Sequence, residues 1–205
     1  MAFMRTTKKS LCGIFFLLVG LVLFSAGCQA FAPYEYKGAL LEPPSSLPDF
    51  ELQDTQGQPF HLSDTQGDIT LVYFGYTFCP DVCPLTMWDV KKALTNLEGR
   101  ERVKVIFISV DPERDTPDVL GRYLEGFDAN YIGLTDDFEK VETVMKPFGA
   151  FAEKEEVADS AAGYLMSHTG RLYLVTPDQK LLLMYPFGFE PEELRSDLTH
   201  LLQQG

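Results

Sequence analysis

Two cysteines, Cys79 and Cys83, stand four positions apart in the segment Cys-Pro-Asp-Val-Cys-Pro. Two thiols at this spacing can converge on one side of a turn, where they form a disulfide or bind one soft metal ion as thiolates. A disulfide that closes so short a loop restricts the unfolded chain little, so a purely stabilising role is the weaker interpretation. The spacing therefore indicates redox or metal chemistry.

The residues on either side of the cysteines predict a strand and a helix. The run Ile69–Tyr76 is apolar, β-branched and aromatic, which is typical of a buried strand. Pro84 then opens a segment with helical spacing of leucine and valine up to Leu97. Strand, cysteine loop and helix is the order in which thioredoxin-like folds place their reactive sulfurs. The unpaired N–H groups at the start of a helix also favour a thiolate.

Three sequence blocks resemble the SCO/SenC family, copper proteins that assist the assembly of cytochrome c oxidase. These blocks are Phe74–Pro84 around the cysteines, Ser109–Pro117 and His168–Val175, and the likeness extends over roughly Pro48 to Leu202. The resemblance implies a thioredoxin-like domain that binds one copper ion, as Cu(I), Cu(II) or both. It also implies a partner, the copper-bearing subunit of cytochrome c oxidase.

His168 is the third candidate metal ligand, and this role comes from the resemblance. On spacing alone, a single histidine is more often a surface or hydrogen-bonded core residue, but the matching position in SCO proteins supplies a copper ligand. Two thiolates and one imidazole suit copper in either oxidation state, whereas a structural zinc requires a fourth protein ligand. His61 and His200 are expected to be exposed. Ser167 stands where relatives often have an aspartate that can orient the ligand.

No proline occurs between Phe148 and Thr176. Thiol–disulfide exchangers of the thioredoxin-like fold usually have a cis-proline before the strand that faces their cysteines, and His168-Thr169 occupies about that place. A proline ring there shields the sulfurs from metal, whereas an imidazole adds a donor atom. The absence of proline therefore favours ion binding over general dithiol exchange.

Charged residues near the expected cysteine loop are weaker candidates. Asp111 follows the second predicted central strand and Asp81 lies between the cysteines, so each is a candidate for supporting a ligand or contacting a partner. A surface ion pair accounts for Arg114, and Asp115 or Thr116 is expected to cap the helix that begins at Pro117. The charged segment Ala150–Ala162 is predicted to be a mobile loop whose motion lets the following histidine move on and off the metal.

The composition indicates a globular chain with an acidic body. Of its 205 residues, 45% are apolar and 23% are charged, which argues against disorder. The net charge is −13, and because residues 1–27 carry three positive charges and no acid, the remainder carries −16. An acidic surface repels phosphates, so nucleic-acid binding is set aside.

The first 27 residues predict export and attachment to a membrane. A basic start precedes the uncharged run 11–27, which as a helix is about 26 Å long, slightly short for a bilayer core of about 30 Å. Small residues before Cys28 resemble a bacterial lipoprotein signal that directs acylation of Cys28, although Ser25 stands where such signals more often have an aliphatic residue. An uncleaved anchor is the alternative. Both place the domain on the extracytoplasmic side of the cell membrane, periplasmic or outer.

We divide the chain into a signal peptide or anchor (1–27), a tether (28–47) and one α/β domain (48–205). The domain is expected to begin with a hairpin over 48–62. The remaining predicted strands are 69–76, 103–110, 131–134, 171–176 and 180–185, and the predicted helices are 85–97, 117–127, 136–148 and 191–203. This order indicates a thioredoxin-like fold, a mixed central sheet flanked by helices.

The leading hypothesis is a membrane-tethered copper chaperone that binds one ion through Cys79, Cys83 and His168 and is a metal carrier rather than an enzyme. The alternative is a thiol–disulfide reductase that keeps the cysteines of the oxidase copper site reduced, with Cys79 and Cys83 as its redox pair. A peroxiredoxin-type enzyme needs a single activated cysteine and fits the paired loop poorly. Replacement of His168 by Ala separates the first two hypotheses.

Overall fold

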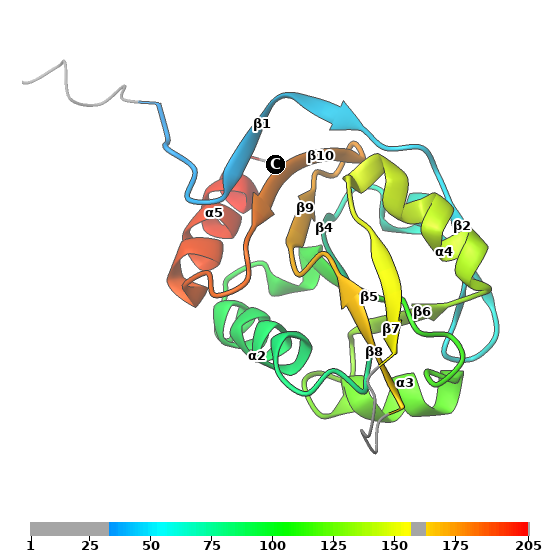
Figure 1. Cartoon of the computed structure of the whole chain (residues 1–205). Helices are drawn as coiled ribbons and strands as arrows, with labels where there is room; N and C mark the ends of the chain where they lie inside the picture. Colours follow the sequence, from blue (N-terminus) through cyan, green and yellow to red (C-terminus); the bar gives the residue numbers. More distant parts are fainter. Residues whose placement is uncertain (1–32, 157–162, 205) are drawn as a thin grey trace, which may run out of the picture. The chain divides into compact units, whose positions relative to one another are not determined.

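The computed structural model describes residues 33–156 and 163–204 (Figure 1). The predicted signal or anchor (1–27) and Cys28 lie outside the described residues, so membrane attachment stays a prediction. Among the residues that are described, no helix is both long and apolar enough to cross a bilayer. Residues Tyr36–Gly205 form one structural unit, which contains every other residue predicted to carry chemistry.

A central eight-stranded sheet organises this unit. Its strands lie in the order β1-β10-β9-β4-β5-β6-β2-β3. Their bounds are β1 Ala39–Ser46, β2 Glu51–Asp54, β3 Pro59–His61, β4 Ile69–Gly75, β5 Val103–Ser109, β6 Ile132–Thr135, β9 Leu172–Val175 and β10 Lys180–Tyr185. The predicted first hairpin, central strands and last hairpin are confirmed by the pairing of β2 with β3, β4 with β5 and β9 with β10.

Strand β4 lies inside the sheet because both of its edges find partners and both of its faces are apolar. It pairs in parallel with β5 along its whole length, from Ile69 opposite Val103 to Gly75 opposite Ser109, and antiparallel with β9. All of its residues are buried, as expected for a strand that is covered on both faces. The combination of parallel and antiparallel pairs confirms the predicted mixed sheet.

Helices flank the sheet. Helix α2 (Val82–Leu94) packs with α5 (Pro191–Gln204) on one side, and α4 (Phe138–Met145) lies on the other (Figure 1). Helix α3 (Pro117–Glu125) packs on β6 and is capped by the hydroxyl of Thr116. The described residues also form the short 3-10 helices η1 Leu62–Thr65, η2 Arg100–Arg102 and η3 Lys146–Phe148. The layers agree with a central sheet flanked by helices.

A separate two-stranded sheet corrects one prediction. Strand β7 (Ala152–Glu156) pairs antiparallel with β8 (Tyr164–His168). The prediction of a mobile loop over Ala150–Ala162 is therefore wrong for β7, and residues 157–162 lie outside the described part of the chain. The side chains of β7 are mostly exposed and charged, so this strand lacks the apolar alternation by which a half-buried strand is recognised.

The predicted tether (28–47) is wrong over its last part. Residues Ala39–Ser46 form β1, an edge strand that pairs antiparallel with β10. Pro43 and Pro44 lie at an irregularity in this pairing, and an edge strand tolerates proline because one of its sides needs no N–H donor. The folded unit therefore begins before Pro48.

The helix after the cysteines begins earlier than predicted. Helix α2 starts at Val82, so Cys83 is its second residue and Pro84 its third. A proline in the first turn removes no hydrogen bond, because the N–H groups of that turn have no partner within the helix. The second cysteine is therefore held by helical backbone rather than by a loop.

Candidate metal centre

The loop between β4 and α2 carries one candidate ligand, and α2 itself carries the second. Cys79 lies in the loop and is half-buried, whereas Cys83 lies in the first turn of α2 and is fully buried. The backbone N–H of Cys83 donates to Sγ of Cys79 over 3.4 Å. Both residues are free thiols. The start of α2 therefore supplies both a sulfur atom and a hydrogen bond to the other sulfur atom.

Gly75, the last residue of β4, leaves the space that Cys83 needs. A Cβ atom at this position would lie 2.7 Å from Cε1 of Tyr73, 2.9 Å from Cζ of Phe107 and 3.1 Å from Sγ of Cys83. Carbon atoms do not approach this closely without displacing their neighbours. The missing side chain therefore lets α2 bring its sulfur atom against the end of the central strand.

Asp115 holds the cysteine loop from the neighbouring strand end. It is fully buried and accepts hydrogen bonds from Thr77 N at 3.0 Å, Thr77 Oγ1 at 2.6 Å and Ser109 Oγ at 2.6 Å. Burial raises the pKa of Asp115, while these hydrogen bonds oppose that shift. Thr77 precedes Cys79 by two residues, so Asp115 fixes the backbone that leads to the first sulfur.

His168 reaches the cysteines from outside the central sheet. It is the last residue of β8 and pairs with Ala152 of β7. Its ring meets the rings of Tyr73 and Tyr76 edge to face, with centroids 6.2 Å and 5.7 Å away. Aromatic side chains from the end of β4 therefore contribute to the orientation of the imidazole.

The three side chains come together in one cluster. The Sγ atoms of Cys79 and Cys83 and a ring nitrogen of His168 lie within 4.8 Å of one another, and Nε2 of His168 is 3.4 Å from Sγ of Cys83. Bonds of about 2.0–2.3 Å from an ion to nitrogen and sulfur place two ligands at most about 4.6 Å apart, so small shifts allow one ion to contact all three. Across residues 33–156 and 163–204, no other group of histidine, cysteine or acidic side chains converges in this way.

The two thiols lose their protons at very different pH. Hydrogen bonds from Cys83 and His168 stabilise the thiolate of Cys79 and lower the pKa of Cys79 to about 3. Burial raises the pKa of Cys83, and the nearby charge of Cys79 raises it further. Without metal, the cluster therefore holds one accessible thiolate and one buried thiol. A metal cation must displace the proton of Cys83 to gain the second sulfur ligand.

The imidazole of His168 lacks the polar support that metal-binding histidines usually have. Its Nδ1 atom is buried and has no hydrogen-bond partner among the described residues. In metal sites the ring nitrogen that does not bind the ion commonly donates to a carboxylate or a carbonyl group. The preceding residue is Ser167, which has no carboxylate to offer. Packing against aromatic rings therefore replaces a polar partner in orienting this ring.

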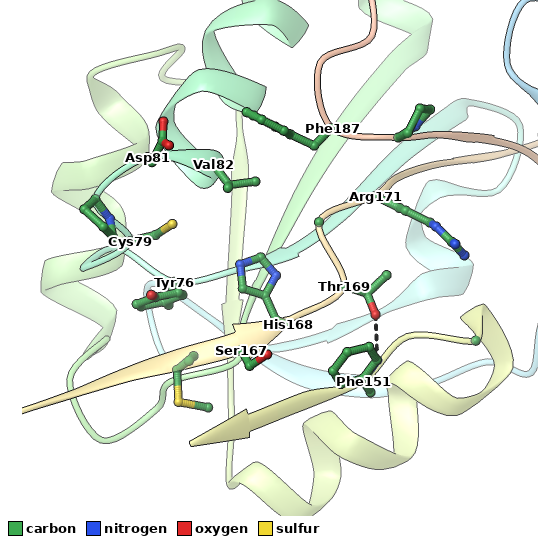
Figure 2. Close-up of a pocket in the computed structure, with 15 residues that line it drawn as sticks. Tyr76, Cys79, Asp81, Val82, Phe151, Ser167, His168, Thr169, Arg171 and Phe187 are labelled. Carbon is green, nitrogen blue, oxygen red and sulfur yellow. Dashed lines mark hydrogen bonds between the residues drawn. The ribbon is translucent and has the colours of Figure 1, made fainter. Parts of the chain in front are cut away.

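Cys79 and His168 line a cavity of about 730 Å³ (Figure 2). Phe151 and Phe187 contribute to its walls, and both are substantially exposed. The fully buried Cys83 is not among the lining residues. The cavity therefore gives access to Cys79 and His168, while Cys83 lies behind them.

The chain matches the SCO1/SenC family model over residues 39–203. It is 32% identical to the SCO2-like protein of Rickettsia felis over 148 residues, which is 71% of this chain and 72% of that protein. This chain belongs to the SCO1/SenC family.

Solved structures of SCO1/SenC proteins have the same mixed α/β fold. ScoI of Bradyrhizobium japonicum, determined with copper bound, is 34% identical, and the match covers 77% of this chain and 99% of that one with a TM-score of 0.68. Apo Sco1 of Thermus thermophilus is 36% identical, with 85% and 99% covered and a TM-score of 0.70. A thioredoxin-like sheet flanked by helices is thus common to this chain and its relatives.

The two acidic candidates of this SCO1/SenC protein lie in different surroundings. Asp111 is buried, bonds to Arg114 and Tyr164, and is not among the residues that line the cavity. Asp81 is exposed, lines the cavity and precedes α2 without forming a side-chain cap. Their roles in supporting a ligand or contacting a partner stay predictions.

The expected surface ion pair does not describe Arg114, and of the two predicted helix caps the structure has Thr116 rather than Asp115. Arg114 is largely buried in its pair with Asp111, and Asp115 bonds to the cysteine loop, while Thr116 provides the cap. Tyr164 is absent from the sequence-based candidates. The family likeness covers the block that contains Asp111. Tyr164, however, lies 53 positions further along the chain, so no local pattern links it to Asp111.

Proposed function

We propose that this protein is a membrane-tethered copper chaperone that binds one copper ion through Cys79, Cys83 and His168 and assists copper-site assembly in cytochrome c oxidase. The observation that carries this proposal is the convergence of two thiols and an imidazole beside a cavity. Two soft sulfur donors and one borderline nitrogen donor suit Cu(I) and also accommodate Cu(II). The copper-bound relative from Bradyrhizobium japonicum supports copper as the ion.

Copper is the cargo of this site, so the site must both hold the ion and release it. Cys83 is fixed in α2 behind the cavity, whereas Cys79 and His168 are accessible from it. The ligands of a receiving protein can approach from the cavity and replace these two first. The buried sulfur then releases the ion last, and it regains its proton because burial favours the neutral thiol.

The client and the location follow from the sequence. The family resemblance implies the copper-bearing subunit of cytochrome c oxidase as the receiving protein. Residues 1–27 act as a signal or anchor, and acylation of Cys28 or an uncleaved segment attaches the domain to the extracytoplasmic face of the membrane. Because β1 begins at Ala39, the linking segment is shorter than the sequence suggests.

A thiol–disulfide reductase that acts on the cysteines of the oxidase is the second candidate, and the accessible thiolate of Cys79 favours it. In that reaction Cys79 attacks a client disulfide, forms a mixed disulfide and releases one client thiolate. Cys83 loses its proton, attacks the Cys79 sulfur and releases the second client thiolate. The client gains two electrons, and the protein is left with a Cys79–Cys83 disulfide.

Copper titration of the pre-reduced full-length chain tests the proposal. Cu(I) and Cu(II) are added separately, and thiolate-to-copper charge-transfer absorption is followed for Cu(II). The Cys79→Ser, Cys83→Ser double variant serves as the blank for copper bound by the remaining cysteines. One equivalent bound above the blank, and lost or sharply weakened in His168→Ala and in Cys83→Ser, supports the chaperone. Weak binding that is indifferent to His168→Ala, together with rapid exchange of a Cys79–Cys83 disulfide, supports the reductase.

A further inference from the structure

The segment Asp111–Asp115, between β5 and α3, contacts both parts of the candidate metal centre. We call residues 75–83, which include the two cysteines, the cysteine half, and we call β7 together with residues 164–169 the histidine half. The cysteine half follows β4 of the central sheet, whereas the histidine half contains the separate β7–β8 sheet, and the two sheets share no backbone pairing. Besides the main chain that leads from His168 into β9, side-chain contacts therefore fix the position of the histidine half.

Asp115 forms the contact of this segment with the cysteine half. Its carboxylate accepts the N–H and the hydroxyl of Thr77, at 3.0 Å and 2.6 Å. Because Asp115 is fully buried, these bonds are shielded from water and are costly to break. One end of the segment is thus fixed to the backbone that leads to Cys79.

Arg114 forms the contact with the histidine half. Its Nε donates to Oδ2 of Asp111 at 2.5 Å, and its Nη1 donates to the backbone carbonyl of Tyr164 at 3.1 Å. The hydroxyl of Tyr164 donates to Oδ1 of Asp111 at 2.7 Å. The side chain of Asp111 is 2% exposed and that of Arg114 is 16% exposed, so these charge-assisted hydrogen bonds are largely protected from solvent.

The guanidinium group of Arg114 also lies near both halves at once. Its Cζ atom is 3.6 Å from the ring centroid of Tyr164 and 5.0 Å from that of Phe78. Phe78 is next to Cys79 in the chain, and Tyr164 begins the strand that ends at His168. One cation therefore contacts the aromatic residue next to Cys79 and the aromatic residue that begins the strand of His168.

A further pair supports the same contact from β7. Nζ of Lys154 lies 3.9 Å from the ring centroid of Tyr164 and 2.9 Å from Oε2 of Glu113. Glu113 belongs to the same segment as Arg114, so both strands of the histidine half contact it. This outer pair is exposed and contributes less than the buried one.

We propose that Arg114 is a positioning residue for copper binding, which holds the histidine half against the cysteine half so that His168 is near the sulfurs before the ion arrives. This inference rests on the proposed function, because it concerns the same three ligands. A preassembled ligand set binds more tightly, since the ion does not have to order its third ligand. Arginine is suited to this role because its planar group donates in two directions while its face stacks on rings, which lysine cannot do.

The first test compares the Cu(I) affinity of the full-length chain with that of R114Q, by competition with a chromogenic Cu(I) chelator. We expect R114Q to bind about 10- to 100-fold more weakly, the usual effect of removing a residue that supports a metal ligand. In the His168→Ala background, the same substitution is expected to change the affinity by no more than about twofold. This loss of effect identifies Arg114 as acting through the histidine.

Two variants control for charge and for general damage. R122Q removes an exposed arginine from α3, the helix that follows the segment, and is expected to bind copper like the parent. R114K keeps the charge but not the planar fork, and is expected to recover little of the lost affinity. Full recovery in R114K, or an equal loss from R114Q in the His168→Ala background, would overturn the proposal.

We call the contact between Arg114 and Tyr164 the clamp. Amide hydrogen exchange of the metal-free chain tests this clamp without copper. We expect the amides of β8 to exchange at least about tenfold faster in R114Q than in R122Q, while those of β4 stay unchanged. Equal exchange in the two variants would overturn the proposal. If the parent chain binds no copper, the proposed function fails, yet this measurement still decides the clamp. Should R114Q not fold, Tyr164→Leu removes the stacked ring and is judged by the same outcomes.

Discussion

The cysteine half and the histidine half contribute to one site, but they are held by different amounts of structure. The cysteine half ends the central strand β4 and begins α2, and Cys83 is fully buried within it. The histidine half is a two-stranded sheet, and the side chains of β7 are mostly exposed. The cysteine half is therefore held by the core of the domain, whereas the histidine half is held by a small sheet and a few side-chain contacts.

The largest expected effect comes from removing the buried ligand. Cys83→Ser replaces a soft sulfur by a hard, neutral hydroxyl group, so we expect Cu(I) affinity to fall at least about 100-fold, which corresponds to about 2.7 kcal/mol. His168→Ala leaves both sulfurs, which are the stronger ligands for Cu(I), and is expected to cost less. Competition with a Cu(I) chelator measures both variants. Equal losses would contradict the difference between the two halves.

The pH dependence of Cys79 distinguishes the two sulfurs within the cysteine half. Because the pKa of Cys79 is lowered to about 3, this residue is a thiolate throughout the range from pH 5 to 8. We expect its alkylation by iodoacetamide to proceed at a nearly constant rate over that range. An ordinary thiol with a pKa near 8.5 slows about tenfold per pH unit below its pKa. Tandem mass spectrometry of the modified peptide assigns the label to Cys79 rather than to Cys83, which lies in the same tryptic peptide.

Two substitutions of Cys83 identify the cause of the lowered pKa of Cys79. The hydrogen bond from the Cys83 side chain is the largest contribution that lowers the pKa of Cys79. Cys83→Ala removes this donor, so alkylation of Cys79 is expected to slow more steeply as the pH falls. Cys83→Ser keeps a donor and is expected to preserve the flat profile. A steep profile in the parent chain would show that Cys79 is an ordinary thiol.

The sequence predicts the cysteine half well because its determinants are local. The apolar run of β4, the two cysteines and the start of a helix lie within about 30 consecutive residues, and each has its own pattern. Even the error in the start of α2 is only a few residues. His168 is predicted by family resemblance alone, because a single histidine has no spacing pattern of its own.

The histidine half is predicted poorly because its determinants are distant. Strand β7 has an exposed, charged sequence and exists because it pairs with β8. The contact between Arg114 and Tyr164 joins residues 50 positions apart, so no local sequence pattern predicts it. Strand β1 resembles a tether in the sequence for a similar reason, since it contains two prolines and its partner β10 lies near the far end of the chain.

A smaller change tests how tightly the cysteine half is packed. Gly75→Ala places a methyl group within 3.1 Å of Sγ of Cys83 and closer still to the rings of Tyr73 and Phe107. We expect it to lower the free energy of unfolding by about 1–3 kcal/mol, the usual cost of overpacking a core. Denaturant titration measures the loss.

Gly121→Ala is the matched control for this substitution. Gly121 lies inside α3, and a Cβ atom there would approach no atom closer than 3.7 Å. Alanine favours a helix more than glycine does, so this variant is expected to be as stable as the parent or more stable by up to about 1 kcal/mol. Equal effects at the two glycines would show that the end of β4 has spare room and would weaken the contrast between the halves.

The smallest effect is expected at the open end of the histidine half. Oγ1 of Thr169 accepts the N–H of Phe151 at 3.1 Å, and the N–H of Thr169 donates to the carbonyl of Phe151 at 3.0 Å (Figure 2). Thr169→Val keeps the shape of the side chain and removes the acceptor. We expect a local cost of about 1 kcal/mol, seen as about fivefold faster exchange of the Phe151 amide with unchanged global stability.

Thr143→Val serves as the control for this last variant, because it removes a hydroxyl that bonds only within α4 and is remote in sequence from the site. It is expected to leave exchange in β7 and β8 unchanged. If Thr169→Val also leaves the Phe151 amide unchanged, the histidine half is not held at its open end. The clamp at Tyr164 would then be the main support of His168, and the contrast between the two halves would become sharper. If instead Thr169→Val lowers global stability by several kcal/mol, the histidine half is part of the cooperative core, and the contrast fails.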